Sequence, residues 1–506
     1  MTKSDTSSFV LELEISFSNT LLNKYKPSKK FILAGTPEIL NKKLEVANLI
    51  YNAILSETEH RRQKVIHDPE YQQALEGYRA AKKAGEDTSP FTAVFKAVKK
   101  RHGYTEYDMH AYSAIPKHHF FDALGADECQ KLASRAFAAS SKVLVGKAKK
   151  VRYHRRGEDT SIDGKSAKST FKYKGDLCIQ CGKGNLYPLI VKKGDTYAEE
   201  ALTHDVKYIR VVRRTIRGKR RYFAQLVLEG IPPRTKNLKY GRKDSKVGLD
   251  EGVSTLAVVS SKEVSLNELA PGTAVDEKEL HRLNRAIDRS RRATNPQNYN
   301  PDGTIKKGRL KWKLSNRCLR LLAARKELYR RNAWNRKCAH NRLANRIVSL
   351  GQDIRVETMA ISGLAKKSKK TTVNKTNGRK RSKKRYGKTV LSRSPAAVIS
   401  AIDRKLTYVG RKIKKIDTAT VKASQYNHKA DIYQKKPLSQ RWNDIGDDKI
   451  QRDLYSAFLI MNTTDKLDSI DRKACQQKYS KFKTMHDAEI QRLKGIDTPA
   501  LRWYIA

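Results

Sequence analysis

The stretch that most constrains the fold runs from Lys246 to Ser260 and has the sequence KVGLDEGVSTLAVVS. Apolar Val247 and Leu249 lead to an acid, Asp250, a glycine follows two residues later, and a second apolar run extends from Leu256 to Val259. This pattern predicts two strands joined by a tight turn, with a carboxylate at the mouth of the hairpin. A carboxylate on an inner strand needs a partner, and a metal ion is a chemically suitable one.

The charge of the chain restricts what it binds. The 506 residues include 106 Lys and Arg against 52 Asp and Glu, a formal net charge of +54. Because self-repulsion of that size is tolerable when a polyanion neutralises it, the charge predicts a nucleic-acid partner. The positive charge runs along the whole length and is not confined to one amphipathic helix, which disfavours a membrane-surface protein.

Length and composition indicate several folded domains. A chain of 506 residues exceeds what one small core supports, and its 38% hydrophobic content is enough for buried cores. The first eight residues are polar and no run of 18 apolar residues occurs, so we expect neither a signal peptide nor a transmembrane helix. Six cysteines in so long a chain do not make a disulfide framework, which favours a reducing, intracellular compartment.

The N-terminal half is predicted to be a β-domain with a helical insert. Residues 9–17 alternate apolar and polar side chains, as a half-buried strand does. Thr36 and Pro37 then open a helix, and helical spacing continues to about Leu144. Short alternating runs separated by turn signals follow and predict more strands. We therefore expect the first part of a β-domain at 1–30, a helical domain at 31–145 and the second part of the β-domain at 146–245.

The C-terminal half is predicted to alternate strands and helices over 246–464, before a helical tail at 465–506. Two long basic helices are expected within a helical insert at 275–350. The first would carry Leu310 to Leu328 and the second Trp334 to Ile347, with Arg and Lys on the remaining faces.

Shorter elements complete this half. Residues 353–359 and 414–420 have the pattern of strands, Ser394-Pro395 that of a capped helix start, and a last clear helix is expected from near Asp447. The basic stretch 366–388 has few apolar residues. It is either a loop that orders on binding or a solvated charge run.

Three acids have informative settings. Asp250 and Glu357 each end a predicted strand, and Asp453 shares a helix face with small and apolar residues such as Ala457. Three carboxylates that meet at one point cannot all ionise without cations between them. Two Mg²⁺ ions held by such a cluster can activate a water and stabilise the leaving oxygen of a phosphodiester. The order of elements matches an RNase H-like fold, a mixed sheet flanked by helices. The alternative is that each acid is an ordinary cap or a solvated residue.

The motifs around these acids resemble a known family. Gly248 to Ala257 is similar to the first RuvC motif of the TnpB family and of the compact type V CRISPR effector nucleases. Arg355 to Met359, followed by Leu364, resembles their second motif, and Gln451 to Ala457 resembles their third. The resemblance is strong over 246–464 and weaker over the N-terminal half.

This resemblance implies a multidomain α+β protein that cleaves DNA under the direction of an RNA guide. A RuvC-like nuclease domain would occupy the C-terminal half, preceded by a small β-barrel-like wedge domain with an inserted helical recognition domain. Asp250, Glu357 and Asp453 are implied to be the catalytic residues and the ligands of two Mg²⁺ ions, and Asp453 would also position the water.

The implied partners are a guide RNA and a double-stranded target DNA beside a short flanking motif, with no membrane and one protein monomer per guide. A prokaryotic cytoplasm is the implied location. Arg441 is a candidate contact to the scissile phosphate. The other candidate nucleic-acid contacts are basic residues of the predicted β-domain and basic helices: Lys149, Lys150, Arg152, Arg155, Arg156, Arg217, Arg220, Arg285, Arg289, Lys313, Arg317 and Arg325.

The chain departs from the resembled family where a zinc ribbon usually lies. Residues 358–474 contain no cysteine, so we expect no zinc in the corresponding region, 421–446, and other contacts such as Trp442 must hold it. Cys178 and Cys181 form half of a zinc motif without a second half, and we predict that they are strand and turn residues.

Other functions stay open at this point. The same fold can serve RNA-guided DNA binding with weak or no catalysis, and a structural RNA-binding protein would share the charge. A guide-free resolvase is disfavoured, because it would not need the basic domains of roughly 245 residues that precede the nuclease-like region. The origin of the guide, the flanking DNA motif and the cut pattern are not fixed by the sequence.

Overall fold

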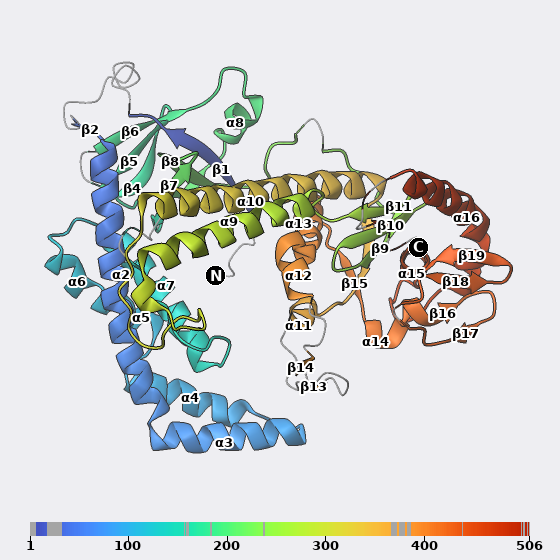
Figure 1. Ribbon diagram of the computed structural model, residues 1–506, viewed down its shortest axis with the longest axis horizontal. Helices are drawn as coiled ribbons and strands as arrows, with labels where there is room; N and C mark the ends of the chain where they lie inside the picture. The colour runs from blue at the N-terminus through green and yellow to red at the C-terminus, as the bar shows by residue number, and fades with distance from the viewer. Residues whose placement is uncertain are drawn as a thin grey trace. The chain divides into compact units, whose positions relative to one another are not determined.

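The computed structural model describes residues 7–17, 33–155, 157, 161–182, 185–235, 238–365, 372–373, 380–381, 386–437, 439–496, 498, 501–502 and 504. The chain divides into two compact units, Met1–Pro233 and Arg234–Ala506. Both units combine helices and strands (Figure 1), which confirms the predicted mixed α+β class. Among the described residues, every helix is too short or too polar to cross a membrane.

The first unit is built around a sheet in which the N-terminal strand is central. Its order is β3-β7-β8-β1-β6-β5-β4, and β2 pairs with β6. On β1, Phe9, Leu11, Leu13 and Ile15 are buried at alternate positions, which confirms the predicted half-buried strand. The strands are β1 (Ser8–Ile15), β2 (Leu33–Ala34), β3 (Ser161–Asp163), β4 (Phe171–Gly175), β5 (Cys178–Cys181), β6 (Asn185–Ile190), β7 (Val206–Ile216) and β8 (Lys219–Glu229).

The helices of this unit follow β1, and the longest of them packs on its sheet. Thr36 caps the first long helix by accepting a hydrogen bond from the Ile39 backbone N–H at 3.4 Å, as its sequence predicts. Leu40, Leu44 and the other apolar positions of that helix join the same core as β1. The helices are α2 (Pro37–Ile66), α3 (Pro69–Ala84), α4 (Ser89–Arg101), α5 (Glu106–Tyr112), α6 (Ala114–His119), α7 (Ala126–Leu144) and α8 (Thr196–Ala201).

The second unit contains a five-stranded mixed sheet with the order β11-β10-β9-β12-β15. β9 and β10 form the predicted hairpin, with Asp250 opposite Ala257, while β12 runs parallel to both β9 and β15. The strands are β9 (Lys246–Glu251), β10 (Thr255–Ser260), β11 (Val264–Glu268), β12 (Asp353–Glu357) and β15 (Lys414–Ile416).

Two separate cores cover the two faces of this sheet. Val247 and Leu249 of β9 pack with α10 and α13, whereas Ala257 and Val259 of β10 pack with α15 and α16. The main helices are α9 (Thr273–Thr294), α10 (Asn316–Leu350), α13 (Pro395–Thr407), α15 (Arg452–Met461) and α16 (Arg472–Lys494). Shorter elements are η1 (Pro296–Asn298), α11 (Ile361–Leu364), β13 (Thr372–Val373), β14 (Lys380–Arg381), α12 (Gly387–Arg393), α14 (Thr418–Val421), η2 (Ala423–Gln425), β16 (Tyr426–Asn427), β17 (Ile432–Tyr433), β18 (Trp442–Ile445) and β19 (Asp448–Gln451).

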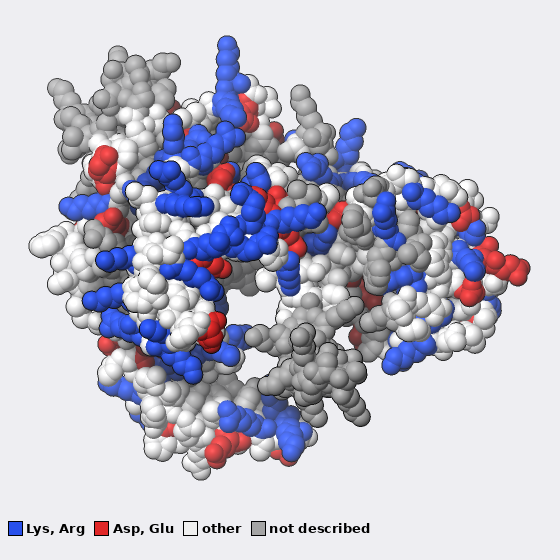
Figure 2. Space-filling view, in the orientation of Figure 1, with Lys and Arg blue, Asp and Glu red and all other residues white. Residues whose placement is uncertain are grey.

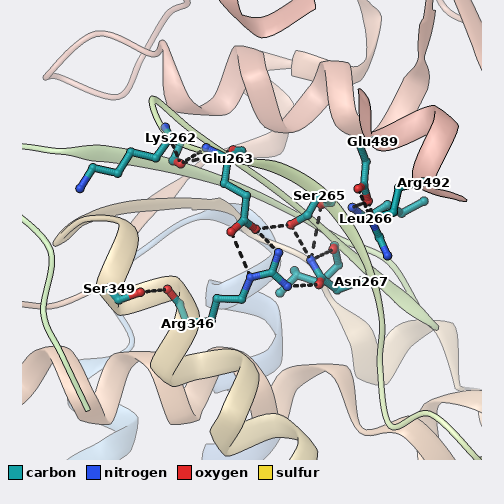
Figure 3. Close-up of polar contacts among 11 residues, drawn as sticks. Lys262, Glu263, Ser265, Leu266, Asn267, Arg346, Ser349, Glu489 and Arg492 are labelled. Carbon is teal, nitrogen blue, oxygen red and sulfur yellow. Dashed lines mark hydrogen bonds and ion pairs between the residues drawn. The ribbon is translucent and has the colours of Figure 1, made fainter. Parts of the chain in front are cut away.

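Polar side chains fasten helices to the edge strand β11 (Figure 3). Glu489 of α16 accepts a hydrogen bond from the Leu266 backbone N–H at 2.8 Å. The carboxylate therefore pairs with a backbone donor that would otherwise be unpaired on an edge strand. Arg346 of α10 contacts the same hairpin through Glu263, at 3.0 Å from its Nε, and through Asn267 at 3.2 Å. The sheet edge is thereby closed by side chains from both neighbouring helices.

Two boundary predictions and one capping prediction are wrong. The two basic helices expected over 310–347 are one helix, α10, because residues 329–333 contain neither glycine nor proline to interrupt it. The last predicted helix begins at Arg452, because Asp448–Gln451 is a strand paired with Trp442–Ile445. α13 begins at Pro395 as predicted, but Ser394 has a left-handed backbone and no side-chain cap bond. Of the basic stretch 366–388, the described residues form β13, β14 and the start of α12.

Candidate active site

The three acids singled out by the sequence lie on three elements of the second unit. Asp250 is on β9, Glu357 is the last residue of β12 and Asp453 is in the first turn of α15. In the register of the sheet Arg355 pairs with Gly248, so Glu357 and Asp250 lie on the same face, to which α15 is attached. Residues separated by about a hundred positions therefore meet at one end of the sheet.

A close approach of helix to strand brings Asp453 to this place. A Cβ atom at Gly248 would lie 2.0 Å from the Ala457 carbonyl oxygen and 2.5 Å from the Met461 backbone nitrogen. Such distances are impossible for any residue with a side chain, so the helix backbone rests directly on the strand. The first motif therefore needs glycine at 248 because the third motif packs on it.

Local hydrogen bonds fix two of the carboxylates. Gln451, which is fully buried, caps α15 by accepting from the Leu454 backbone N–H at 2.8 Å. Its amide nitrogen donates to Asp453 Oδ2 at 3.3 Å. The Ala423 backbone N–H donates to Glu357 Oε1, also at 3.3 Å. Both acids are thus oriented by neighbours that are themselves held in the core.

The electrostatics of the three acids are those of a crowded anionic site. Burial raises the pKa of Asp250 well above its usual range, and the negative charges of Asp453 and Glu357 raise it further. Burial also raises the pKa of Glu357 and of Asp453, although the Arg441 guanidinium opposes the rise at Asp453. A cation placed among these oxygens would relieve the repulsion.

Arg441 is a cationic side chain beside the cluster. Its Nη1 lies 3.8 Å from Asp453 Oδ2, and its guanidinium carbon lies 4.9 Å above the centroid of the Tyr504 ring. Within the described part of the chain, no three His, Cys, Asp or Glu side chains stand close enough together to hold a metal ion by themselves. The acids interact electrostatically without forming a closed cage.

Arg355 is a further element of the site that sequence reasoning did not single out. It is fully buried two residues before Glu357, and its Nη2 lies 2.9 Å from both Asp353 Oδ2 and Asp465 Oδ1. Its Nη1 donates to Thr463 Oγ1 at 3.0 Å, just beyond the end of α15. Arg355 thus ties the strand of Glu357 to the segment after the helix of Asp453. In the sequence, Arg355 could have been recognised as a charged residue at the centre of a strand predicted to be buried, where a charge needs partners.

Glu251 was also missed. It follows Asp250 on β9 and therefore points to the opposite face of the sheet. Only 7% of its surface is exposed, and burial raises the pKa of its carboxyl to about 7. The strict alternation of a strand could have indicated that one of the two adjacent acids must face a core.

The cysteine-free region 421–446 is held by polar and aromatic side chains. It contains two small hairpins, β16–β17 and β18–β19. Arg472 of α16 donates to the His428 carbonyl oxygen at 2.9 Å and lies 3.1 Å from Asp431. The His428 ring is 2.6 Å from the Tyr455 hydroxyl and packs against the Tyr479 ring. The predicted contact, Trp442, packs edge-on against the ring of His486.

We expect this region to weaken in acid because of His428. The side chain is 1% exposed, and burial together with the charges of Lys429 and Arg472 lowers its pKa to about 4. In the unfolded chain the value is about 6.5. Between these values the unfolded state binds a proton that the folded state does not. The contribution of neutral His428 to the free energy of unfolding is therefore present in full above about pH 6.5. It decreases toward pH 4 by on the order of 2–3 kcal/mol.

The measurement is the thermal midpoint of the full chain at a series of pH values, compared with the midpoint of His428→Gln. The difference between the two proteins should be largest near neutral pH and should shrink as the pH falls. Curves that stay parallel over the whole range would show that His428 does not titrate between the folded and unfolded states.

Most of the predicted nucleic-acid contacts are exposed. Figure 2 shows Lys and Arg side chains gathered over α9 and α10. Arg325 donates to Asn284 at 2.9 Å, and Arg441 lies beside Asp453. Arg156 lies outside the described residues. The exposed predicted contacts are Lys149, Lys150, Arg152, Arg155, Arg217, Arg220, Arg285, Arg289, Lys313 and Arg317.

The basic segment that includes Arg152 and Arg155 is anchored to the long helix α2. Asn52 donates to the His154 carbonyl oxygen at 2.8 Å and accepts from its backbone N–H at 2.9 Å. The His154 ring stacks on Tyr51 with centroids 4.1 Å apart. In the same unit, Cys178 and Cys181 are buried free thiols on β5.

Comparison with known proteins gives structural neighbours only. No family model and no curated protein matches the chain. It aligns with a Cas12f1–sgRNA–target DNA complex solved by cryo-EM, at 12% identity and a TM-score of 0.42, over 90% of this chain and 99% of that chain. It also aligns with a CRISPR–Cas12f ternary complex, at 13% identity and a TM-score of 0.25, over 90% and 99%. A third match is a Cas12i1 R-loop complex before target DNA cleavage, at 8% identity and a TM-score of 0.24, over 90% and 66%.

These neighbours are type V CRISPR effectors, the class that the sequence motifs resemble. All three TM-scores lie below 0.5. The function of this chain is therefore argued from its own residues.

Proposed function

We propose that this protein is an RNA-guided DNA endonuclease with a RuvC-like active site formed by Asp250, Glu357 and Asp453. The observation that carries the proposal is the meeting of these carboxylates at one end of a mixed sheet, where burial and mutual repulsion raise the pKa of Asp250. A cluster of this kind is costly for a fold and is typical of a functional site. The motif order and the charge of +54 agree with it.

The donor set suits Mg²⁺. Carboxylate oxygens are hard ligands, and Mg²⁺ usually takes one or two of them while keeping waters and binding substrate phosphates. The lack of a closed three-residue cage among the described residues is compatible with this requirement. Asp250, Glu357 and Asp453 would hold the metal. When bound, two such ions would supply an activated water and charge stabilisation for the leaving oxygen of a phosphodiester.

The remaining residues of the site have supporting roles in this proposal. Gln451 keeps the Asp453 carboxylate oriented, and the Ala423 N–H does the same for Glu357. Arg441 is placed beside Asp453 to contact the scissile phosphate, since a guanidinium matches phosphate geometry. Arg355 keeps the strand of Glu357 and the end of α15 in fixed register.

The basic surfaces would hold the guide RNA and the guide–target duplex. In this proposal the sheet of the first unit is the wedge domain and α2 to α7 are the recognition domain. Sequence would be read by base pairing, while exposed Lys and Arg contact the phosphates. A short DNA motif beside the target would be recognised by the protein directly.

The test begins with the RNA that co-purifies with the full-length protein. After that RNA is sequenced, the complex is incubated with a matching double-stranded DNA and with a scrambled one, in Mg²⁺ and in EDTA. We expect cleavage of the matching DNA in Mg²⁺ alone. Tight binding of the matching DNA without cleavage would favour an RNA-guided binding protein, and bound RNA without DNA binding would favour a structural RNA-binding protein.

A further inference from the structure

A pocket of about 690 Å³ lies on the face of the sheet opposite Asp250. It opens where β9 and β12 end, and residues of α13 form its other wall. A volume of this size accommodates a nucleotide-sized ligand. Its lining includes Glu251, Glu357, Met359, Ile361, Ile399 and Lys415.

Glu251 is the distinctive group of this pocket. Its side chain is more than nine-tenths buried, and Oε1 has no hydrogen-bond partner among the described residues. A buried acceptor without a partner destabilises a fold, so it is retained where a ligand supplies the donor. The terminal torsion of a glutamate is soft, so a partial rotation of the carboxyl about it would turn Oε1 from its shielded position toward the pocket. The proposed metal site does not use this residue.

The other walls define the chemical class of the ligand. Met359, Ile361 and Ile399 supply apolar surface for the face of a flat ring, and exposed Lys415 supplies a cation at the rim. An apolar slot with a carboxylate inside and a cation outside matches a nucleobase with N–H donors on its edge and a phosphate on its sugar. Because Glu357 belongs both to this pocket and to the proposed cleavage site, the nucleotide would lie next to the scissile phosphate.

We propose that this pocket binds a guanine base of the DNA strand being cut, with Glu251 as the residue that selects it. Guanine presents two adjacent donors, N1–H and N2–H, which match the two oxygens of a carboxylate. Adenine and cytosine present one amino group beside a ring acceptor that repels a carboxylate, and thymine presents one N–H between two carbonyls. The strand and position named here rest on the proposed nuclease function, whereas binding of the base does not.

The test is direct binding of dGMP, dAMP, dCMP and dTMP to the full-length protein without metal or DNA, measured by saturation-transfer NMR at mildly alkaline pH. We expect dGMP to bind most tightly. Glu251→Gln should weaken dGMP binding about tenfold, equivalent to about 1.4 kcal/mol, and should leave dTMP binding unchanged. The matched control is Glu279→Gln, which changes a half-buried glutamate of α9 that pairs with Arg282, outside the pocket lining, and should behave as the unaltered protein. Equal binding of the four nucleotides would overturn the proposal.

A second variant keeps the test decisive if Glu251→Gln folds poorly. Ser400→Trp places a large ring at the exposed mouth of the pocket, where the native hydroxyl bonds only within its own helix. It should abolish the preference for dGMP, and a preference that survives it would overturn the proposal.

Cleavage assays separate this inference from the proposed nuclease. A guided nuclease that cuts equally well with guanine or thymine beside the scissile phosphate, and that has no preference for dGMP, would overturn the pocket alone. Selective binding of dGMP by a protein that cuts no DNA would support the pocket and overturn the nuclease.

Discussion

Asp250→Ala is expected to abolish Mg²⁺-dependent cleavage of guided DNA while leaving RNA and DNA binding intact. Asp250 receives the repulsion of both Asp453 and Glu357, so a cation bound among the three acids would interact with its carboxylate. Its removal takes away a ligand shared by any cation bound there. We expect the cleavage rate to fall by at least about 10²–10³-fold, the scale on which loss of one electrostatic stabiliser lowers kcat.

The same substitution should make the metal-free protein more stable. The pKa of Asp250 is raised above its value in the unfolded chain, so its ionised form opposes folding at neutral pH. Removing the group should raise the thermal midpoint by about 2–4 °C for each kcal/mol of repulsion relieved. A structural acid would have the opposite effect on stability. Gain of stability with loss of activity is the combination expected of a residue kept for its chemistry.

Asp288→Ala is the matched control, because Asp288 is an exposed aspartate of α9 in the same unit. It should change neither cleavage nor the thermal midpoint. The measurements are single-turnover cleavage of a matching DNA, filter binding of the same DNA, and thermal unfolding without metal. Cleavage by Asp250→Ala at the unaltered rate would contradict the assignment of this residue to the active site.

The sequence was most informative where a short pattern carries its own geometry. Alternation and a turn signal were sufficient to predict the hairpin of β9 and β10 and the acid at its end. Register could not be predicted, because it depends on which residues of β12 pair with β9. The pairing of Arg355 with Gly248 decides that Glu357 lies on the face of Asp250. That fact requires tertiary structure.

The errors share a physical cause. α10 continues through a stretch of polar residues because nothing in its backbone stops it, and apolar spacing alone suggested two helices. Gln451 ends a strand and caps α15 at once, a role that the usual capping residues did not suggest. Arg355 and Glu251 are buried charges on predicted strands, so the local pattern could have marked them, but Asp465 beside Arg355 and the cavity beside Glu251 come from distant segments and their roles require tertiary structure.

Gly248→Val is expected to separate α15 from the sheet and remove both stability and cleavage. Even the smallest side chain would place Cβ 2.0 Å from the Ala457 carbonyl oxygen, so the helix must move away from β9. Overpacking of a core costs about 1–3 kcal/mol, and here the obstacle is backbone, which cannot change rotamer. Asp453 moves with the helix, so activity should fall more steeply than the thermal midpoint.

A second substitution shows whether backbone contact is the cause. Ala457→Gly removes a side chain and leaves the carbonyl oxygen in place, so it should not rescue Gly248→Val. Gly495→Ala is the control, since a Cβ there meets only ordinary contacts, the nearest at 3.5 Å, and the residue has a negative φ. The readouts are thermal unfolding and Mg²⁺-dependent cleavage. Unaltered values for Gly248→Val would show that the helix does not rest on this strand, and Asp453 would then lose its place beside Asp250.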